Sequence, residues 1–491
     1  MSAQGSKFDF DIAVVGSGPA GLAAAALAAS KGASVVLLDE QAEPGGQIYR
    51  AVTETPVRDR KVLGPDYWHG AELLGPLRDS GATHWPGTTV WSVARPREDA
   101  ADGSRPIQIG LSRNGAASML TVRHVILATG ALERPFPIPG WTLPGVLGAG
   151  AAQVLLKTSG LVPSGATVMA GSGPLLWLLA WQYLQAGARI DAILDTTPRE
   201  NWRAALPLLP GFLRSPYLGK GMKLMLDVRR KLTVIGNVTS LRAESGLAGG
   251  KGGEGVLKSV VYTRNGTEHR LPADTLLLHH GVIPNLNLAN ATGCAQRWDE
   301  QQRCWRPTTD EWGATSVEGV SLAGDGAGIG GARAAEEAGR LTALDALYRL
   351  GRIGREQRDQ SAAPFRAALD RALTGRAFLD TLYTPAEAFR VPADDTIVCR
   401  CEEVTAGAVR EAVRLGCSGP NQAKSFLRCG MGPCQGRLCG PTVTEVIAAE
   451  RNVSPAEVGY YRLRPPVKPI TLAELAALPK TDADIDAVFK H

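Results

Sequence analysis

The chain has 491 residues, of which 44% are hydrophobic and 21% charged, enough for two or three domain cores. The formal net charge of +5 is small for this length, and no Lys/Arg run with interleaved aromatics is present, so we expect no nucleic-acid partner. The N-terminus lacks a basic segment followed by an apolar one, and the longest apolar run, 175–184, is about half of a ~20-residue membrane span. These features predict a cytoplasmic protein, and they leave peripheral docking on the inner face of a membrane open.

The first predicted element is a nucleotide-binding βαβ unit. An apolar strand at 10–15 leads into a glycine-rich turn, a helix follows at 19–30, and a strand at 34–38 ends in two carboxylates. The candidate dinucleotide contacts of this unit are Gly16, Gly18, Pro19, Ala20, Gly21, Asp39 and Glu40. The three glycines permit the bend, the approach of a pyrophosphate to the backbone, and the packing of helix on strand. The ribose hydroxyls are assigned to Asp39, and Glu40 is the alternative.

A degraded copy of this unit is predicted about 155 residues further on. A strand at 166–170 enters Gly171-Ser172-Gly173-Pro174, a helix follows at 175–185, and the next strand ends at Asp195. The third glycine position holds Leu176, which loosens the approach of helix to strand, and Asp195 would repel the 2′-phosphate of NADPH. Two interpretations stay open here: a second bound nucleotide, NAD or ATP, or a vestigial lobe.

Three later segments extend the pattern of the first turn. They are Gly45-Gly46-Gln47, a strand ending in Thr129-Gly130, and a strand ending in Gly324-Asp325. With the glycine turn, they resemble the two-dinucleotide flavoprotein family that includes the disulfide reductases. The resemblance implies that the first lobe binds FAD and that Asp325 holds the ribityl chain or the phosphate region. No cysteine follows Gly46 before Cys294, so we do not expect dithiol chemistry. His279-His280 end another apolar strand, where packing is favoured over a metal or proton-transfer role.

Two close cysteine pairs near the C-terminus predict a metal–thiolate module. Cys399 and Cys401 have one residue between them, and Cys434 and Cys439 have four. Structural zinc pairs usually have two residues between them, so the spacing favours [2Fe–2S], with zinc as the alternative. Thr405 is predicted to cap the helix that follows the first pair. The remaining thiols are assigned to packing: Cys294, Cys304, Cys417 and Cys429.

The cysteine module resembles the bacterioferritin-associated-ferredoxin type of [2Fe–2S] domain, through the residues 398–405, 430–436 and 439–442. Together with 39–47 and 464–469, it makes the whole chain similar to one family: the A subunits of opine oxidases, the B subunit of hydrogen cyanide synthase, and the α subunits of proline or hydroxyproline dehydrogenases. The resemblance implies a complex in which a glycine-oxidase-like FAD subunit oxidises the C–N bond of an amino acid, imino acid or opine. This chain would pass the electrons to an external acceptor. Some relatives add a small third subunit with its own Fe–S cluster, and FMN at a subunit interface stays open.

The predicted fold is α/β, with two Rossmann-like lobes, the second inserted in the first, and a small, mainly helical C-terminal [2Fe–2S] domain. We expect an FAD lobe at 1–160, a second nucleotide lobe at 161–280, the close of the FAD lobe at 281–345, a helical connector at 346–395, the [2Fe–2S] domain at 396–455 and an extended tail at 456–491. Two other functions stay open: an NADH-dependent FAD/[2Fe–2S] reductase acting on a partner protein, and a non-catalytic protein that only serves assembly.

Overall fold

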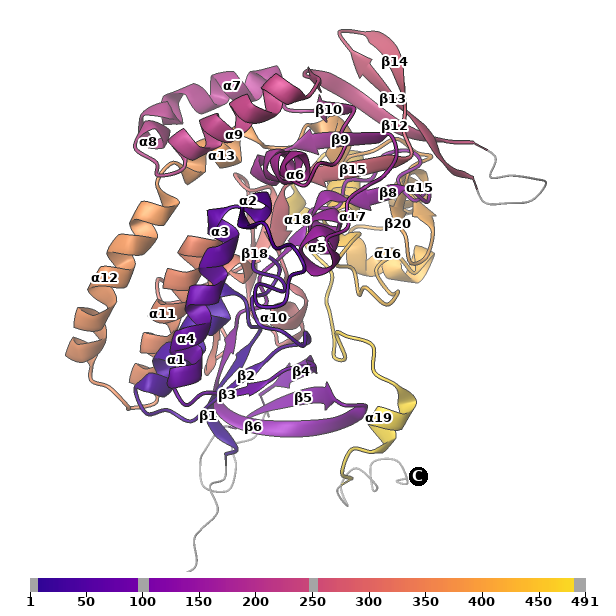
Figure 1. Cartoon of the computed structure of the whole chain (residues 1–491). Coiled ribbons are helices and arrows are strands. Elements are labelled where there is room, and N and C mark those ends of the chain that lie inside the picture. Colours follow the sequence, from indigo (N-terminus) through magenta and orange to yellow (C-terminus); the bar gives the residue numbers. More distant parts are fainter. Residues whose placement is uncertain (1–7, 96–105, 247–254, 481–491) are drawn as a thin grey trace, which may run out of the picture.

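A seven-stranded sheet forms the base of the first lobe in the computed structural model, which describes residues 8–95, 106–246 and 255–480 (Figure 1). The strands run in the order β3-β2-β1-β6-β5-β4, and β19 pairs with β6. The pairs among β3, β2, β1, β6 and β19 are parallel, whereas β4, β5 and β6 are antiparallel. The strands are β1 (Phe10–Val15), β2 (Val35–Leu38), β3 (Thr83–Trp85), β4 (Thr88–Ala94), β5 (Ile107–Arg113), β6 (Ala116–Leu127) and β19 (Val320–Leu322).

Two alanine-rich helices, α1 (Pro19–Ser30) and α11 (Ala332–Arg349), pack closely in this lobe. A Cβ at Gly339 of α11 would lie 2.2 Å from the carbonyl oxygen of Ala20, so only glycine allows this approach. The helix α12 (Arg355–Leu373) packs on α11 from outside (Figure 1). Short helices follow β2: α2 (Arg60–Leu63), α3 (Pro65–Trp68), η1 (His69–Leu73) and α4 (Leu74–Asp79).

The second lobe has a five-stranded parallel sheet in the order β11-β10-β9-β15-β8. Its strands are β8 (Val146–Gly148), β9 (Thr167–Ser172), β10 (Ala192–Asp195), β11 (Val234–Ile235) and β15 (Thr275–His280), and its helices are α5 (Ala149–Ser159), α6 (Pro174–Gln185), α7 (Arg199–Ala205), α8 (Leu209–Leu213) and α9 (Leu218–Lys231). An antiparallel sheet of β12 (Val238–Gly246), β13 (Val256–Arg264) and β14 (Thr267–Pro272) extends from it (Figure 1). Since β8 pairs with β15, the second sheet takes in residues ahead of 161, where the sequence placed its start.

The chain crosses between the lobes twice, and these crossings pair as β7 (Ala131–Glu133) with β16 (Val282–Pro284). The short helix α10 (Asn287–Ala291) and the hairpin of β17 (Gln296–Asp299) and β18 (Cys304–Pro307) lie between β16 and the return strand β19. The second lobe is therefore inserted in the first, as the predicted α/β fold requires.

The C-terminal module is mainly helical and lies beside both lobes (Figure 1). Its elements are β20 (Ile397–Cys399), β21 (Val404–Thr405), α15 (Ala406–Arg414), α16 (Pro420–Leu427), α17 (Gly440–Arg451) and α18 (Pro455–Val458), preceded by α13 (Arg376–Leu382) and α14 (Glu387–Arg390). The Thr405 hydroxyl accepts from the amide of Ala408, which confirms the predicted cap. The tail then returns to the first sheet, where the amide of Val467 donates to the Trp91 carbonyl at 2.9 Å, and it ends in α19 (Leu472–Ala476). No helix in the described part of the chain is long and apolar enough to span a bilayer.

Candidate functional site

The first glycine turn is packed so tightly that two of its glycines have no room for a side chain. A Cβ at Gly21 would lie 1.8 Å from the Gly16 carbonyl oxygen, and one at Gly16 would lie 2.5 Å from that of Ala128. Gly18 differs, because a Cβ there would meet its nearest protein atom, the Cα of Gly46, at an ordinary contact distance of 3.8 Å, and Gly18 lines a cavity. The turn thus joins helix to strand through Gly16 and Gly21, and it exposes backbone to a ligand at Gly18.

The two candidate carboxylates have different surroundings. Asp39 is buried and accepts from the Ser17 amide at 2.6 Å, the Ser17 hydroxyl at 2.7 Å and the Gln41 amide at 2.7 Å. Glu40 is more exposed and pairs with Lys468 of the tail, with 2.6 Å between Nζ and Oε2. Asp39 therefore braces the glycine turn, whereas Glu40 joins the tail to the same edge.

A buried lysine that the sequence did not single out holds the loop after these carboxylates. The Lys157 ammonium donates to the carbonyls of Gln47 at 3.2 Å and Ile48 at 2.9 Å, and to the Gln153 side chain at 2.8 Å. Burial lowers the pKa of Lys157 to about 7. The loop also lies against the glycine turn, since a Cβ at Gly46 would be 2.7 Å from the Cα of Gly18. Gly46 and Gln47 are thus fixed beside Gly18.

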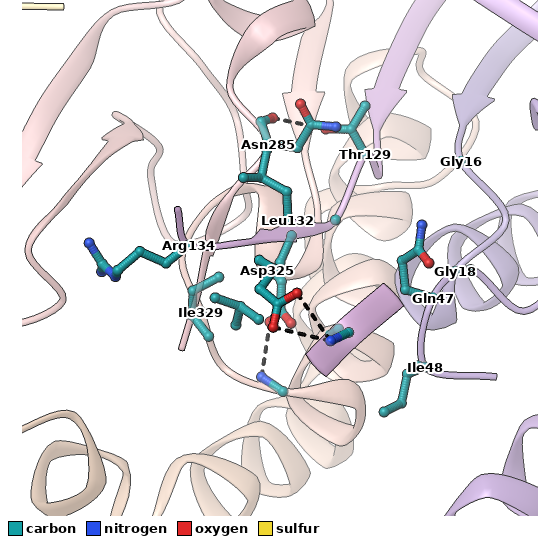
Figure 2. Close-up of a pocket in the computed structure, with 18 of the residues that line it drawn as sticks. Gly16, Gly18, Gln47, Ile48, Thr129, Leu132, Arg134, Asn285, Asp325 and Ile329 are labelled. Carbon is teal, nitrogen blue, oxygen red and sulfur yellow. Dashed lines mark hydrogen bonds between the residues drawn. The ribbon is translucent and has the colours of Figure 1, made fainter. Parts of the chain in front are cut away.

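Thr129 and Asp325, each at the end of a strand, lie on the opposite side of the site from Gly18 and Gln47 (Figure 2). The Asp325 carboxylate accepts from the amides of Gly330 and Gly331, both at 2.9 Å. The Thr129 hydroxyl donates to the Asn285 carbonyl at 3.3 Å. Asp325 therefore has a fixed position at the cavity wall.

These segments surround one cavity of about 920 Å³. The wall takes in the candidate residues Gly16, Gly18, Pro19, Ala20, Asp39, Glu40, Gly46, Gln47, Thr129, Gly130 and Asp325. Gly21 and Gly324 lie behind the wall, where they allow close packing on Gly16 and Ala20. The exposure of Gly18 to the cavity and the size of the cavity fit the pyrophosphate and the rings of FAD.

The second glycine turn borders the same cavity through Gly173. Its third position, Leu176, is 1% exposed and packs in the core. Asp195 accepts from the amide of Thr197 at 2.9 Å, and burial raises the pKa of Asp195. This turn therefore lacks the tight glycine contact that joins helix to strand in the first.

The two histidines at the end of β15 have separate partners. His280 stacks on Phe136 with 3.7 Å between ring centroids, and its Nε2 bonds the Thr196 hydroxyl at 3.1 Å, which agrees with packing. His279 bonds the Glu133 carboxylate through Nδ1 at 2.6 Å, and both residues line the cavity. No sequence pattern marks this pair, because Glu133 lies 146 residues away.

The C-terminal module gathers five cysteines rather than four. The sulfur atoms of Cys399, Cys429 and Cys439 lie within 4.8 Å of one another. Cys434 hydrogen-bonds the thiols of Cys439 and Cys401, so the group continues to the exposed Cys401. Cys429, which the sequence assigned to packing, thus belongs to the group. The sequence signal that could have found it is the repeat of the interval: four residues separate Cys429 from Cys434, and four separate Cys434 from Cys439.

Hydrogen bonds between sulfur atoms lower the pKa of Cys399 and Cys434 and raise the pKa of their partners Cys429 and Cys439, so they favour the thiolate at two positions of this group. The thiols of Cys429 and Cys439 lower the pKa of Cys399 to about 2, and that of Cys439 lowers the pKa of Cys434 to about 5. Thiolates are the ligands of iron–sulfur clusters. The donor set therefore fits a [2Fe–2S] cluster, which needs four of the five sulfurs.

The second cysteine pair also forms part of the cavity wall, through Cys434, Arg437 and Leu438. The side-chain amide of Asn287, in α10 of the first lobe, holds this loop by donating to the Gln435 carbonyl at 3.0 Å. Asn287 itself lines the cavity. One member of the cysteine group, Cys434, therefore lines the same cavity as the nucleotide turn.

Comparison with known proteins finds matches for both the nucleotide-binding lobes and the cysteine module. Residues 10–339 match the family described as pyridine nucleotide-disulphide oxidoreductase, and residues 397–449 match the BFD-like [2Fe-2S] binding domain. The opine oxidase A subunit of Agrobacterium tumefaciens (strain Ach5) is 49% identical over 98% of this chain and 94% of its own length. Hydrogen cyanide synthase subunit HcnB of Pseudomonas aeruginosa is 32% identical over 93% of this chain and 96% of its own.

Among solved structures, the fold is similar to that of L-proline dehydrogenase from P. horikoshii. The TM-score is 0.69 at 19% identity, over 95% of this chain and 79% of that one. The likeness supports the mixed α/β fold with a helical C-terminal module.

Proposed function

The chain belongs to the family of opine oxidase A subunits, and from this premise we propose that it is the electron-transfer subunit of a heteromeric dehydrogenase. The complex would oxidise the C–N bond of an amino acid, imino acid or opine. The cofactors of this chain are FAD and a [2Fe–2S] cluster. FAD exchanges two electrons and the cluster exchanges one, so the pair supplies two-to-one electron conversion when bound.

One observation carries this proposal: the loop bearing Cys434 is part of the wall of the flavin cavity. The glycine turn leaves backbone exposed to the nucleotide at Gly18, while Cys434, Arg437 and Leu438 face the same chamber. With both cofactors bound, these residues would separate the path of electron transfer from bulk solvent. The hydrogen bond from the side-chain amide of Asn287 to the Gln435 carbonyl fixes the position of this loop relative to the first lobe.

The substrate site is assigned to a partner, a glycine-oxidase-like FAD subunit, with or without a small third Fe–S subunit. The names of the relatives support this division, since each is called one subunit of an oxidase or a synthase. Cys399, Cys401, Cys434 and Cys439 are proposed as ligands of the cluster, and the cavity residues around Gly16, Asp39 and Asp325 as contacts of FAD.

The ligand set is tested by single substitutions in the full chain. Cys401→Ser and Cys434→Ser should abolish the electron paramagnetic resonance signal of the reduced cluster, because each removes a ligand. Cys429→Ser should keep the signal, and so should Cys417→Ser, a matched control whose thiol instead meets the Gly419 carbonyl at 3.3 Å. Loss of the cluster in Cys429→Ser, with Cys401→Ser intact, would replace Cys401 by Cys429 in the ligand set.

The electron-transfer role is tested with the assembled complex and its amine substrate. Cys434→Ser should keep the FAD content and substrate-dependent flavin bleaching, while reduction of a one-electron acceptor falls at least about tenfold. Cys417→Ser should behave as the wild type. Unchanged acceptor reduction in an assembled Cys434→Ser complex that lacks the cluster would refute the role.

A further inference from the structure

We propose that Tyr461 is a positioning residue for the cluster: its hydroxyl donates a hydrogen bond to the sulfur of Cys439 and makes the cluster easier to reduce. The inference rests on the proposed function, in which Cys439 is a ligand. Hydrogen bonds to cluster sulfurs raise reduction potentials because they stabilise the extra negative charge of the reduced state.

The hydroxyl of Tyr461 faces sulfur only. Its oxygen lies 3.8 Å from Cys439 Sγ, and it also hydrogen-bonds the thiol of Cys429. Within the described residues, this hydroxyl has no oxygen or nitrogen partner, and the side chain is 1% exposed. A cysteine bound to iron has no proton, so the phenol must be the donor in that bond.

The cysteine loop is shaped to receive the tyrosine ring. A Cβ at Gly430 would lie 2.5 Å from Cζ of Tyr461, and one at Gly436 would lie 2.8 Å from its Cδ2. Both glycines also have positive φ, +86° and +77°. They therefore allow the loop to close over the ring, with the hydroxyl end against the sulfurs.

The first lobe holds the backbone of Tyr461 in place. The side-chain amide of Asn290, in α10, donates to the Tyr461 carbonyl at 2.9 Å and accepts from the Leu463 amide at 2.9 Å. The same helix carries Asn287, which holds the Cys434 loop. One helix thus sets the positions of both the sulfur loop and its hydrogen-bond donor.

The adjacent Tyr460 supplies a matched control. Its hydroxyl end packs on Gly440, where a Cβ would lie 2.2 Å from the oxygen, and its ring lies 6.3 Å from that of Trp305. No sulfur hydrogen-bonds its hydroxyl within the described part of the chain. Tyr460→Phe therefore removes the hydroxyl of a half-buried tyrosine without removing a hydrogen-bond donor to the cluster.

The test is a redox titration of the full chain, followed by the resonance signal of the reduced cluster. Tyr461→Phe should keep the signal but shift the equilibrium constant for reduction about two- to tenfold toward the oxidised cluster, since a neutral hydrogen bond contributes about 0.5–1.5 kcal/mol. Tenfold corresponds to about 59 mV for one electron. Tyr460→Phe should titrate as the wild type. An unchanged midpoint in Tyr461→Phe would overturn the inference.

A second measurement does not depend on the variant folding. In the wild-type protein, electron–nuclear double resonance should detect a cluster-coupled proton of a phenol hydroxyl that exchanges in D2O, in addition to the backbone amide protons that face Cys399 and Cys434. Absence of any such proton overturns the role of Tyr461. Absence of the cluster signal itself would instead refute the proposed function, so the two failures are distinguishable.

Discussion

The two glycine turns of this molecule begin alike and differ in their third position. In the first turn, Gly21 touches the backbone of Gly16, and the open position Gly18 faces the cavity. In the second turn, Leu176 fills the space between helix and sheet with a buried side chain. The difference shows that one turn is built around backbone exposed to a ligand, while the other is stabilised by its own core.

Substitution of the cavity-lining glycine of the first turn should have the strongest consequence. Gly18→Ala should yield a folded protein without bound FAD, because the Cβ meets no protein atom within 3.8 Å but occupies the space of the pyrophosphate. The backbone there, φ −72° and ψ −177°, suits alanine. Flavin content of the purified protein is the measurement, with circular dichroism to verify folding.

The control for this prediction is Gly173→Ala in the second turn, which should retain FAD. Its φ of +110° is strained for alanine, so some loss of stability is expected there. A Gly18→Ala protein with a full complement of flavin would place the nucleotide elsewhere.

In the second turn, the buried side chain of Leu176 should contribute to stability rather than to flavin binding. Leu176→Ala should lower the free energy of unfolding by about 2–5 kcal/mol, because it removes a buried side chain and leaves a cavity. The flavin spectrum of the folded protein should be unchanged. Urea denaturation measures the loss, and a destabilisation below about 1 kcal/mol would mean that Leu176 is not a core residue of this lobe.

Each of the two large sheets contains a buried histidine that should make the stability of the protein depend on pH. Burial, with a smaller contribution from Arg349, lowers the pKa of His124 in β6 to about 3, and burial also lowers that of His280 in β15. Below a pH of about 6.5 the unfolded chain binds a proton that the folded histidine does not, so stability falls as pH falls toward 3.

His124→Gln and His280→Gln should each reduce this dependence by about one proton, or about 1.4 kcal/mol per pH unit. Unfolding free energies measured between pH 6 and pH 4 provide the comparison. A slope that neither substitution changes would show that the histidines are protonated within the fold.

The ion pair between Glu40 and Lys468 of the tail should have the weakest influence on FAD binding. Lys468→Ala removes the partner of Glu40, an ion pair that is partly exposed and so contributes about 1 kcal/mol or less. FAD affinity should fall by no more than about fivefold, measured by equilibrium dialysis. A loss above about a hundredfold would assign Lys468 a direct contact with the nucleotide.

Much of this architecture was predictable, because its signals are local in sequence. The glycine turns, the helix at 19–30, the cap at Thr405 and the cysteine pairs each lie within a few residues of their partners. The roles of Lys157 and Asn287 could not be predicted from the sequence. Lys157 holds a loop about 110 residues away in the chain, and Asn287 holds one about 148 residues away. Cys429 was missed for another reason: its sulfur position depends on how 428–436 closes around Tyr461.

We propose that electrons enter this chain from a partner protein of the complex rather than from NADH. The most direct test is anaerobic spectroscopy of the purified chain, first with NADH and then with the partner flavoprotein and its amine substrate. We expect NADH to leave the flavin oxidised, while partner and substrate bleach it and produce the signal of the reduced cluster. Rapid bleaching by NADH alone would contradict this claim and make the chain a reductase in its own right.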